Sequence, residues 1–339
     1  MVKDKSMNDE IVIQEFVHDV GATEDNIGAM LLNVIKDADM KTLYENLNGK
    51  SPKECLLTLM NWLHKWQQEY QCVMESLLQY IETTNNGQEH EENAEEIKEM
   101  DVEAKEILNG FEILTLELLK ECKDATQVDA MDDMGWTLLM QAANFGSIAF
   151  VQKLLENHAS PSIRQHQKQN GMHALARAVD VGHLNVVELL TTADTINAVF
   201  EYSNQDEEES EVEMHTPLTL ACRHGHEDIV HFFLSQSILD VNQHLPESGD
   251  TALHIATCFD HYDLVQELVK RKDLQINAIN TQGYTAVFGC SNADIVQLLL
   301  SNGLDALISG NEGETALDLA IALEDEEVAE LLDTHISQQ

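Results

Sequence analysis

Apolar residues in the second half of the chain recur in short runs that have the period of an α-helix. One run places Val265, Leu268 and Val269 on a single face. Another apolar run precedes each of these across a short polar turn. The valines that open the later runs are Val151, Val187, Val230 and Val265. The pattern therefore predicts pairs of short helices, each of which buries one face against its neighbours.

A short motif stands before each predicted pair. Its clearest copy reads Gly-Asp-Thr-Ala-Leu-His-Ile-Ala at residues 249–256. Copies begin at positions 137, 173, 216, 251, 285 and 315, at intervals of 36, 43, 35, 34 and 30 residues. The motif resembles the Thr-Pro-Leu-His-x-Ala signature of ankyrin repeats, and the intervals bracket the period of about 33 residues that this family has.

The resemblance implies a fold of the all-α class, an ankyrin-repeat solenoid of six repeats with a helical cap. It is clear over about 130–337, within a predicted domain of 126–339, and an α-helical N-terminal domain precedes it. Glycines fit two places in each repeat, a left-handed turn between the helices and the tip of the hairpin that links repeats. They stand between the helices at Gly146, Gly182 and Gly225, and in the linking hairpins at Gly135, Gly171, Gly249, Gly283 and Gly313.

Three units depart from the repeat. Residues 204–213 carry six carboxylates and lengthen one interval, which predicts a solvated acidic insert. In the fifth unit only eleven residues separate Thr285 from Val296, where the other units have fourteen, so its first helix should lack about one turn. The sixth unit has acidic residues at 324–327 where inner units carry Gly-His, as expected of a C-terminal cap that meets water.

The first 103 residues have helical periodicity without the repeat, and residues 104–130 loosely resemble the second helix and exit loop of an ankyrin unit. In residues 1–50 the pattern predicts a small three-helix module, because the helical periodicity breaks at Gly21 and at Asp39. Residues 10–48 resemble the UBA-like domains of ubiquitin-system adaptors, which implies a component of the ubiquitin system as a partner. In residues 51–125 the pattern predicts a helical hairpin that leads into the N-terminal cap of the repeats.

Two features of this region bear on partner binding. In ubiquitin-binding members of the UBA-like family the first loop usually carries a Met-Gly-aromatic triplet, of which only Gly21 is present here. Trp62, Trp66 and Tyr70 follow one another at intervals of four residues and form an aromatic stripe on a predicted helix. The stripe either packs against the neighbouring helices or lines a groove for a partner helix.

Acidic residues outnumber basic ones along the whole chain. The 61 Asp and Glu against 19 Lys and Arg give a net charge of -42, which repels nucleic acid and anionic membrane surfaces. No apolar run approaches the roughly 18 residues of a membrane span, and the first residues lead into no secretory signal. Six cysteines without a C-x-x-C pair favour reduced thiols. We therefore expect an intracellular, cytoplasmic protein.

Motifs for cofactor or nucleophile chemistry are absent from the sequence, including the phosphate-binding glycine loops and G-x-S-x-G. Several of the fifteen histidines occupy recurrent ankyrin positions, which implies hydrogen bonds to loops and helix ends. These histidines are His183, His226, His254 and His261. Cysteines near the ends of the first helices are expected to pack, namely Cys222, Cys258 and Cys290. We therefore predict no cofactor, no metal and no catalytic residue.

Ankyrin repeats hold ligands on the concave surface made by hairpin tips and first helices, so the resemblance implies that specificity lies there. Four large aromatic residues at such positions are the expected anchors, because exposed rings are costly unless they are used. They are Trp136, Phe145, Phe259 and Tyr284, of which Phe145 could equally pack under a neighbouring hairpin. The other candidate partner-binding residues are Asp133, Met134, Asn144, Met172, Asp180, Val181, His215, Arg223, His224, Asp250, Gln282 and Glu314.

The leading functional hypothesis is a non-enzymatic adaptor that binds a protein partner on the concave face. The acidity of the chain predicts a partner that presents Lys or Arg around an apolar centre. The alternative is an enzyme or a microbial effector, with an activity in the N-terminal helical region and with repeats that recruit its substrate. In the effector case the host-cell cytosol would be the compartment.

Overall fold

The computed structural model describes residues 57, 60–61, 128–165, 171–202 and 212–338. The chain divides into two compact units, Met1–Lys123 and Asp124–Gln339. All the helices and strands described below belong to the second unit. The predicted three-helix module, the helical hairpin and the aromatic stripe lie outside the described residues, apart from three helical positions at 57, 60 and 61.

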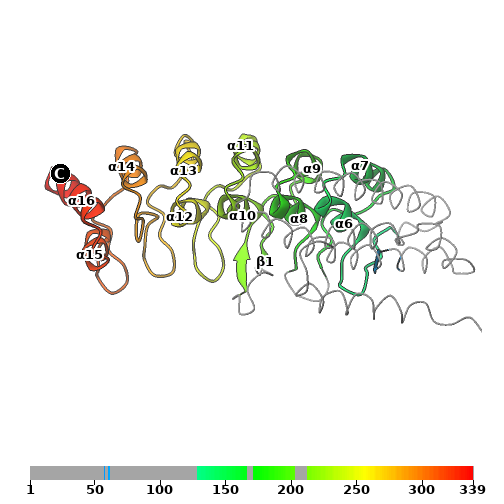
Figure 1. Cartoon of the computed structure of the whole chain (residues 1–339), viewed down its shortest axis with the longest axis horizontal. Helices are drawn as coiled ribbons and strands as arrows, with labels where there is room; N and C mark the ends of the chain where they lie inside the picture. Colours follow the sequence, from blue (N-terminus) through cyan, green and yellow to red (C-terminus); the bar gives the residue numbers. More distant parts are fainter. Residues whose placement is uncertain (1–56, 58–59, 62–127, 166–170, 203–211, 339) are drawn as a thin grey trace, which may run out of the picture. The chain divides into compact units, whose positions relative to one another are not determined.

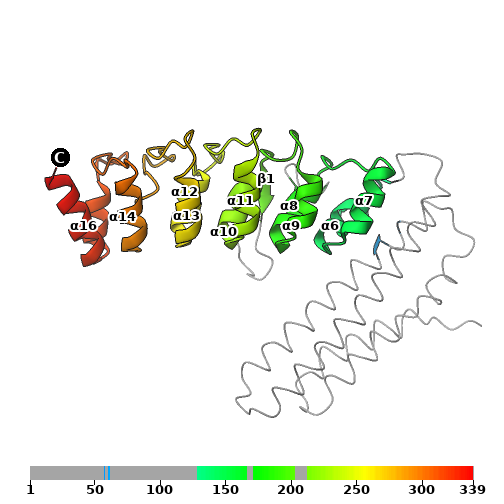
Figure 2. The ribbon, with the colours of Figure 1, turned by 90° about the horizontal axis from the view of Figure 1, so that it is seen from above.

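The second unit consists of two layers of short helices (Figure 1). The inner layer contains α6 (Leu138–Asn144), α8 (Ala174–Val181), α10 (Pro217–His224), α12 (Ala252–Cys258) and α15 (Ala316–Ala322). The outer layer contains α7 (Ile148–Glu156), α9 (Leu184–Leu190), α11 (Glu227–Ser235), α13 (Tyr262–Leu268), α14 (Ala293–Ser301) and α16 (Glu326–Ser337). Within each layer, helices of adjacent repeats pack on one another, and the connecting loops gather along one edge (Figure 2). The predicted helix pairs are confirmed in every unit but the fifth.

The recurrent threonine of the motif begins the inner helices. The hydroxyls of Thr137, Thr216 and Thr315 accept a hydrogen bond from the backbone N–H three residues later, which caps each helix. Thr251 forms a capping box with His254. In the second repeat a histidine takes this position, since His173 Nδ1 accepts from the N–H of Ala176 at 3.0 Å.

Left-handed residues reverse the chain between inner and outer helices, as predicted. Gly146, Gly182 and Gly225 have φ values of 71°, 86° and 71°. Where the glycine is missing, Asp260 and Glu324 adopt the same region, at 61° and 60°. The glycines also leave room for the next repeat, because a Cβ atom on Gly146 would lie 2.7 Å from the ring of His183.

A pair of short strands interrupts the helical pattern in the third repeat. Strand β1 (Phe200–Tyr202) pairs antiparallel with β2 (Glu213–His215), with Tyr202 opposite Glu213. The acidic insert predicted at 204–213 ends before residue 213, because Glu213 belongs to strand β2. The strands are too short to show an alternating pattern, which is why they could not be predicted from the sequence.

The fifth unit has no inner helix. Residues 285–290 form turns, and only the outer helix α14 follows them. The sequence predicts the loss of about one turn; the loss is larger than that. Thr285 stands at the helix-capping position, and its buried hydroxyl has no hydrogen-bond partner among the described residues because there is no helix for it to cap.

This unit should be the least stable part of the repeats. We expect backbone amides of residues 283–300 to exchange with solvent before those of 216–270, because the fifth unit lacks the inner-layer packing that the third and fourth units have. Native-state hydrogen exchange followed by mass spectrometry measures this. Uniform protection from residue 216 to residue 330 would contradict it.

The helices α15 and α16 form the last described pair. Its outer side meets water, as expected of a cap, and Leu323 between the helices is 62% exposed. Asp325 caps α16 by accepting from the N–H of Val328 at 3.2 Å. Among the described residues, no helix is long and apolar enough to cross a membrane.

Candidate functional site

The hairpin tips and the inner helices form one surface, which we call the inner face. A side chain shapes the tip of the first hairpin: Asp132 accepts from the N–H groups of Met134 and Trp136, at 3.0 and 2.8 Å. Asn280 accepts in the same way from Gln282 and Tyr284 in the fifth unit. Asp132 and Asn280 each stand five residues before a motif threonine, a recurrence that could have identified these residues in the sequence.

The first expected anchor is buried. Trp136 is only 6% exposed, and the guanidinium of Arg177 lies 4.1 Å from the centre of its ring. Arg177, itself 8% exposed, donates to Gln165 at 3.1 Å and lies 3.8 Å from Asp180. Burial lowers the pKa of Arg177 to about 10, so it keeps its charge at neutral pH. The expectation that Trp136 is an exposed anchor is therefore wrong.

Met172 and His215, two other candidates for partner contact, are also buried. His215 lies in β2 and bonds the carboxylate of Glu213 at 3.0 Å through Nε2 and the hydroxyl of Thr219 through Nδ1. Burial lowers the pKa of His215, although Glu213 acts against this shift. Both side chains therefore lie beneath the inner face and not on it.

The middle of the inner face is a continuous set of contacts between charged and aromatic side chains. The imidazole of His224 lies 3.3 Å from the carboxylate of Asp180 and 3.3 Å from the hydroxyl of Tyr202. The guanidinium of Arg223 lies 5.7 Å from the ring centre of Tyr202 and 4.9 Å from that of Phe259. Arg223 also pairs with Glu213 at 2.5 Å.

We call this set the inner-face strip. It comprises Trp136, Arg177, Asp180, Tyr202, Glu213, Arg223, His224 and Phe259. Side chains from four repeats contribute to it, and His224 and Phe259 are its exposed members on the inner helices. The structure thus brings together five predicted residues, namely Trp136, Asp180, Arg223, His224 and Phe259. The sequence analysis missed Arg177, Tyr202 and Glu213, of which Tyr202 and Glu213 are placed in the strip by β1 and β2.

A second aromatic cluster lies at the fifth and sixth hairpins. The rings of Tyr284 and Phe288 stack with centres 4.4 Å apart and planes 9° apart. A hydrogen bond from the Tyr284 hydroxyl to Glu314 raises the pKa of the tyrosine and lowers that of the carboxyl. Tyr284 and Glu314 are half-buried and belong to a site separate from the strip.

The remaining candidates are spread along the inner face. Asp133, Met134, Val181 and Gln282 are exposed, and Asn144, Phe145 and Asp250 are half-buried. Asp250 accepts from the side-chain amide of Asn280 at 2.9 Å, which joins the fourth hairpin to the fifth. Phe145 ends α6.

The resemblance implied hydrogen bonds to loops and helix ends for four recurrent histidines, and three of them bond neighbouring repeats in this way. Through Nε2, His183 contacts the carbonyl oxygen of Asn144, His254 that of Tyr284, and His261 that of Arg223. His226 differs, since its Nε2 is buried with no hydrogen-bond partner among the described residues.

The thiols near the first helices are held in the protonated form. Burial raises the pKa of Cys222 to about 12 and that of Cys290 to about 11. Such thiols are poor nucleophiles at neutral pH, and their burial agrees with the packing role expected for Cys222 and Cys290. Cys258 is exposed, so the packing role expected for it is wrong. Within the described ranges, no group of three metal-ligating side chains comes together.

Comparisons with known proteins agree with this architecture. A family model described as ankyrin repeats (3 copies) matches residues 105–200 and 194–280. Alpha-latrocrustotoxin-Lt1a from Latrodectus tredecimguttatus is 25% identical over 130 residues, which are 38% of this chain and 9% of that protein. The chain therefore spans less than a tenth of the length of this relative.

Solved structures show the same fold at low identity. The ankyrin repeat domain of human ASB11 is 19% identical, with a TM-score of 0.51 over 66% of this chain and 92% of that one. The ankyrin repeat domain of Bcl-3 is also 19% identical, with a TM-score of 0.54 over 66% and 94%. The all-α repeat fold expected from the sequence motifs is therefore confirmed.

Proposed function

The chain belongs to the ankyrin-repeat family, whose repeats in general mediate protein–protein interaction, and on that premise we propose that it is a non-enzymatic adaptor. The inner-face strip is the proposed binding site for a protein partner. The single observation that carries this assignment is the continuity of the strip from Trp136 to Phe259 across four repeats.

The strip has the composition of an interface centre. Phe259 is 39% exposed, and Arg223 covers one part of its ring and holds it in place. Aromatic and arginine side chains carry much of the energy at protein interfaces, because they contribute large contact areas at a small loss of conformational freedom. Val181 and Met134, at 47% and 41% exposure, add apolar surface on neighbouring repeats.

Carboxylates surround this centre. Asp133, Asp180 and Asp250 lie on the inner face, and the arginines of the strip are already paired with Asp180 and Glu213. The proposed partner therefore presents an apolar group flanked by Lys or Arg. Opposite charges at the rim mainly accelerate association, and this effect weakens as salt is added.

A matched pair of substitutions tests the site. A partner recovered with the full chain should bind Phe259→Ala more weakly by about 2 kcal/mol or more, the loss typical of a central anchor. Tyr262→Ala serves as the control, because Tyr262 is 37% exposed but lies in the outer helix α13. Calorimetric titration measures both affinities, and circular dichroism checks that helicity is kept. Equal affinity of the two variants would remove the inner-face strip as the site.

The second half of the adaptor proposal concerns the N-terminal unit. The UBA-like pattern of residues 10–48 supports a component of the ubiquitin system as its ligand, with the cytoplasm as the compartment. Titration of isotope-labelled ubiquitin with the full chain should shift a localised set of ubiquitin resonances. An unchanged ubiquitin spectrum at millimolar chain concentration would exclude this ligand and leave the inner-face site unaffected.

A further inference from the structure

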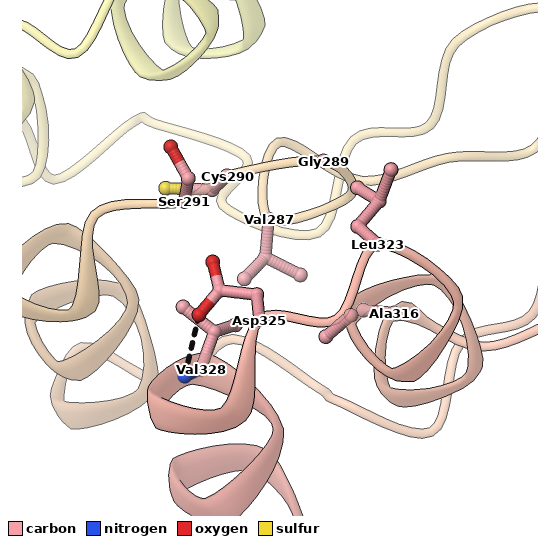
Figure 3. A pocket seen from close by; sticks show the side chains of 9 residues that line it. Val287, Gly289, Cys290, Ser291, Ala316, Leu323, Asp325 and Val328 are labelled. Atoms are coloured by element: carbon pink, nitrogen blue, oxygen red, sulfur yellow. Dashed lines mark hydrogen bonds between the residues drawn. The ribbon is translucent and has the colours of Figure 1, made fainter.

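The missing inner helix of the fifth unit leaves a cavity at the surface. Its volume is about 120 Å³, and it lies between the 285–291 turn and the last helix pair (Figure 3). The lining residues are Val287, Gly289, Cys290, Ser291, Ala316, Ala320, Leu323, Asp325 and Val328. Most of the lining is apolar, and Figure 3 shows Val287, Ala316 and Val328 directed toward one another across it.

The size of the cavity suits a single aliphatic side chain. For comparison, an engineered apolar protein cavity of about 150 Å³ binds benzene and stays dry without it. Leu323 stands at the edge, and at 62% it is the most exposed large apolar side chain in the described part of the chain. Exposure of the apolar lining and of its apolar edge to water is unfavourable, so a partner that covers them gains free energy of binding.

The charge around the cavity has one sign. From Asp273 to the C-terminal end of the sequence there are twelve Asp and Glu and no Lys or Arg. Asp260 and Asp325 lie close enough to Cys290 to add to the effect of burial on the pKa of that thiol. A positively charged occupant is therefore attracted, and a second copy of this acidic chain, with its net charge of -42, is repelled.

We propose that this cavity binds a basic amphipathic helix of another protein, which inserts one Leu, Ile, Val or Met side chain between the turn and α15. The partner helix would lie over the 285–291 turn, at the position in the inner layer where every other repeat has a helix of seven or eight residues, and only its inserted side chain would enter the cavity. Its flanking Lys or Arg side chains would lie near Asp260 and Asp325. The site is separate from the inner-face strip.

A displayed library of helical peptides of about 14 residues, randomised along one face, provides the probe. Selection on the full chain should enrich peptides that carry one large aliphatic residue between basic ones. The decisive variant is Ala320→Leu, which fills the cavity with a side chain of the protein itself. We expect it to bind the enriched peptides at least tenfold more weakly while it retains the melting temperature of the parent.

Two further variants locate the bound peptide at the cavity. Asp325→Asn keeps a side chain that can cap α16, and it should weaken binding severalfold and reduce its salt dependence. Ile148→Ala removes an exposed apolar side chain from the outer helix α7 and should leave peptide affinity unchanged. The proposal is overturned if no such peptides are enriched, if they bind Ala320→Leu as tightly as the parent, or if replacing their aliphatic residue with serine has no effect.

Discussion

Replacement of Trp136 by alanine should lower the free energy of unfolding by about 3–5 kcal/mol, the range measured for large aromatic residues in protein cores. The indole is 6% exposed and carries the guanidinium of Arg177 on its face at 4.1 Å. Its removal leaves a cavity and also leaves Arg177, which is 8% exposed, without the ring that covers it. Urea unfolding followed by circular dichroism measures the change.

Trp136→Phe is the informative control. Phenylalanine keeps an aromatic face under the guanidinium and restores most of the volume, so the loss should be clearly smaller than that of the alanine variant. If Trp136→Ala unfolds at the same urea concentration as the parent, the tryptophan does not support the first hairpin in the way described. A loss of partner binding in this variant would reflect damage to the hairpin, so it cannot identify an anchor.

The case of Trp136 shows where the sequence stops being informative. Its position at a hairpin tip follows from the repeat, and the repeat is visible because the glycine and threonine positions serve backbone needs that recur in every unit. Its burial depends on Arg177, which comes from the next repeat, 41 positions along the chain. Contacts between repeats are set by side-chain shape and leave no periodic signal, so exposure on the inner face could not be predicted.

The same reasoning applies to the strands and to the fifth unit. The long interval before residue 216 reveals an insertion. The two strands that place Tyr202 opposite Glu213 have only three residues each, which is too few to give a recognisable alternating pattern. The short spacing after Thr285 reveals missing residues. The spacing does not show that too few residues remain to form a helix. Helix initiation is costly, because the first turn orders several residues for a single hydrogen bond.

His173 gives the repeats a sensitivity to acid that the threonine cap would not have. Its side chain is 1% exposed, and burial together with the nearby charge of Arg164 lowers its pKa from 6.5 to about 4. The folded state therefore binds a proton at this site less readily than the unfolded state does. The contribution of neutral His173 to the free energy of unfolding is fully present above pH 6.5. It is lost progressively as the pH falls toward 4, by about 3 kcal/mol in total.

The sequence of the other repeats supplies the variant that isolates this effect. His173→Thr introduces the residue that caps α6, α10, α12 and α15, and so it keeps a cap on α8 without a titrating group. Between pH 7 and pH 4 the parent should lose about 3 kcal/mol more unfolding free energy than this variant, because carboxylates titrate equally in both. Denaturant unfolding at a series of pH values measures the difference.

Thr137→Ser is the matched control, because it alters the corresponding cap of α6 without adding or removing a titrating group, and so it should leave the pH dependence unchanged. The edge-to-face contact of His173 with Phe200 is lost in His173→Thr at every pH, so it shifts the whole stability curve without changing its slope. The slope is therefore the quantity that reports protonation. If the stability difference between parent and His173→Thr stays constant from pH 7 to pH 4, His173 does not titrate as its burial requires, and the acid sensitivity of the repeats must come from other groups, such as His215 and the carboxylates.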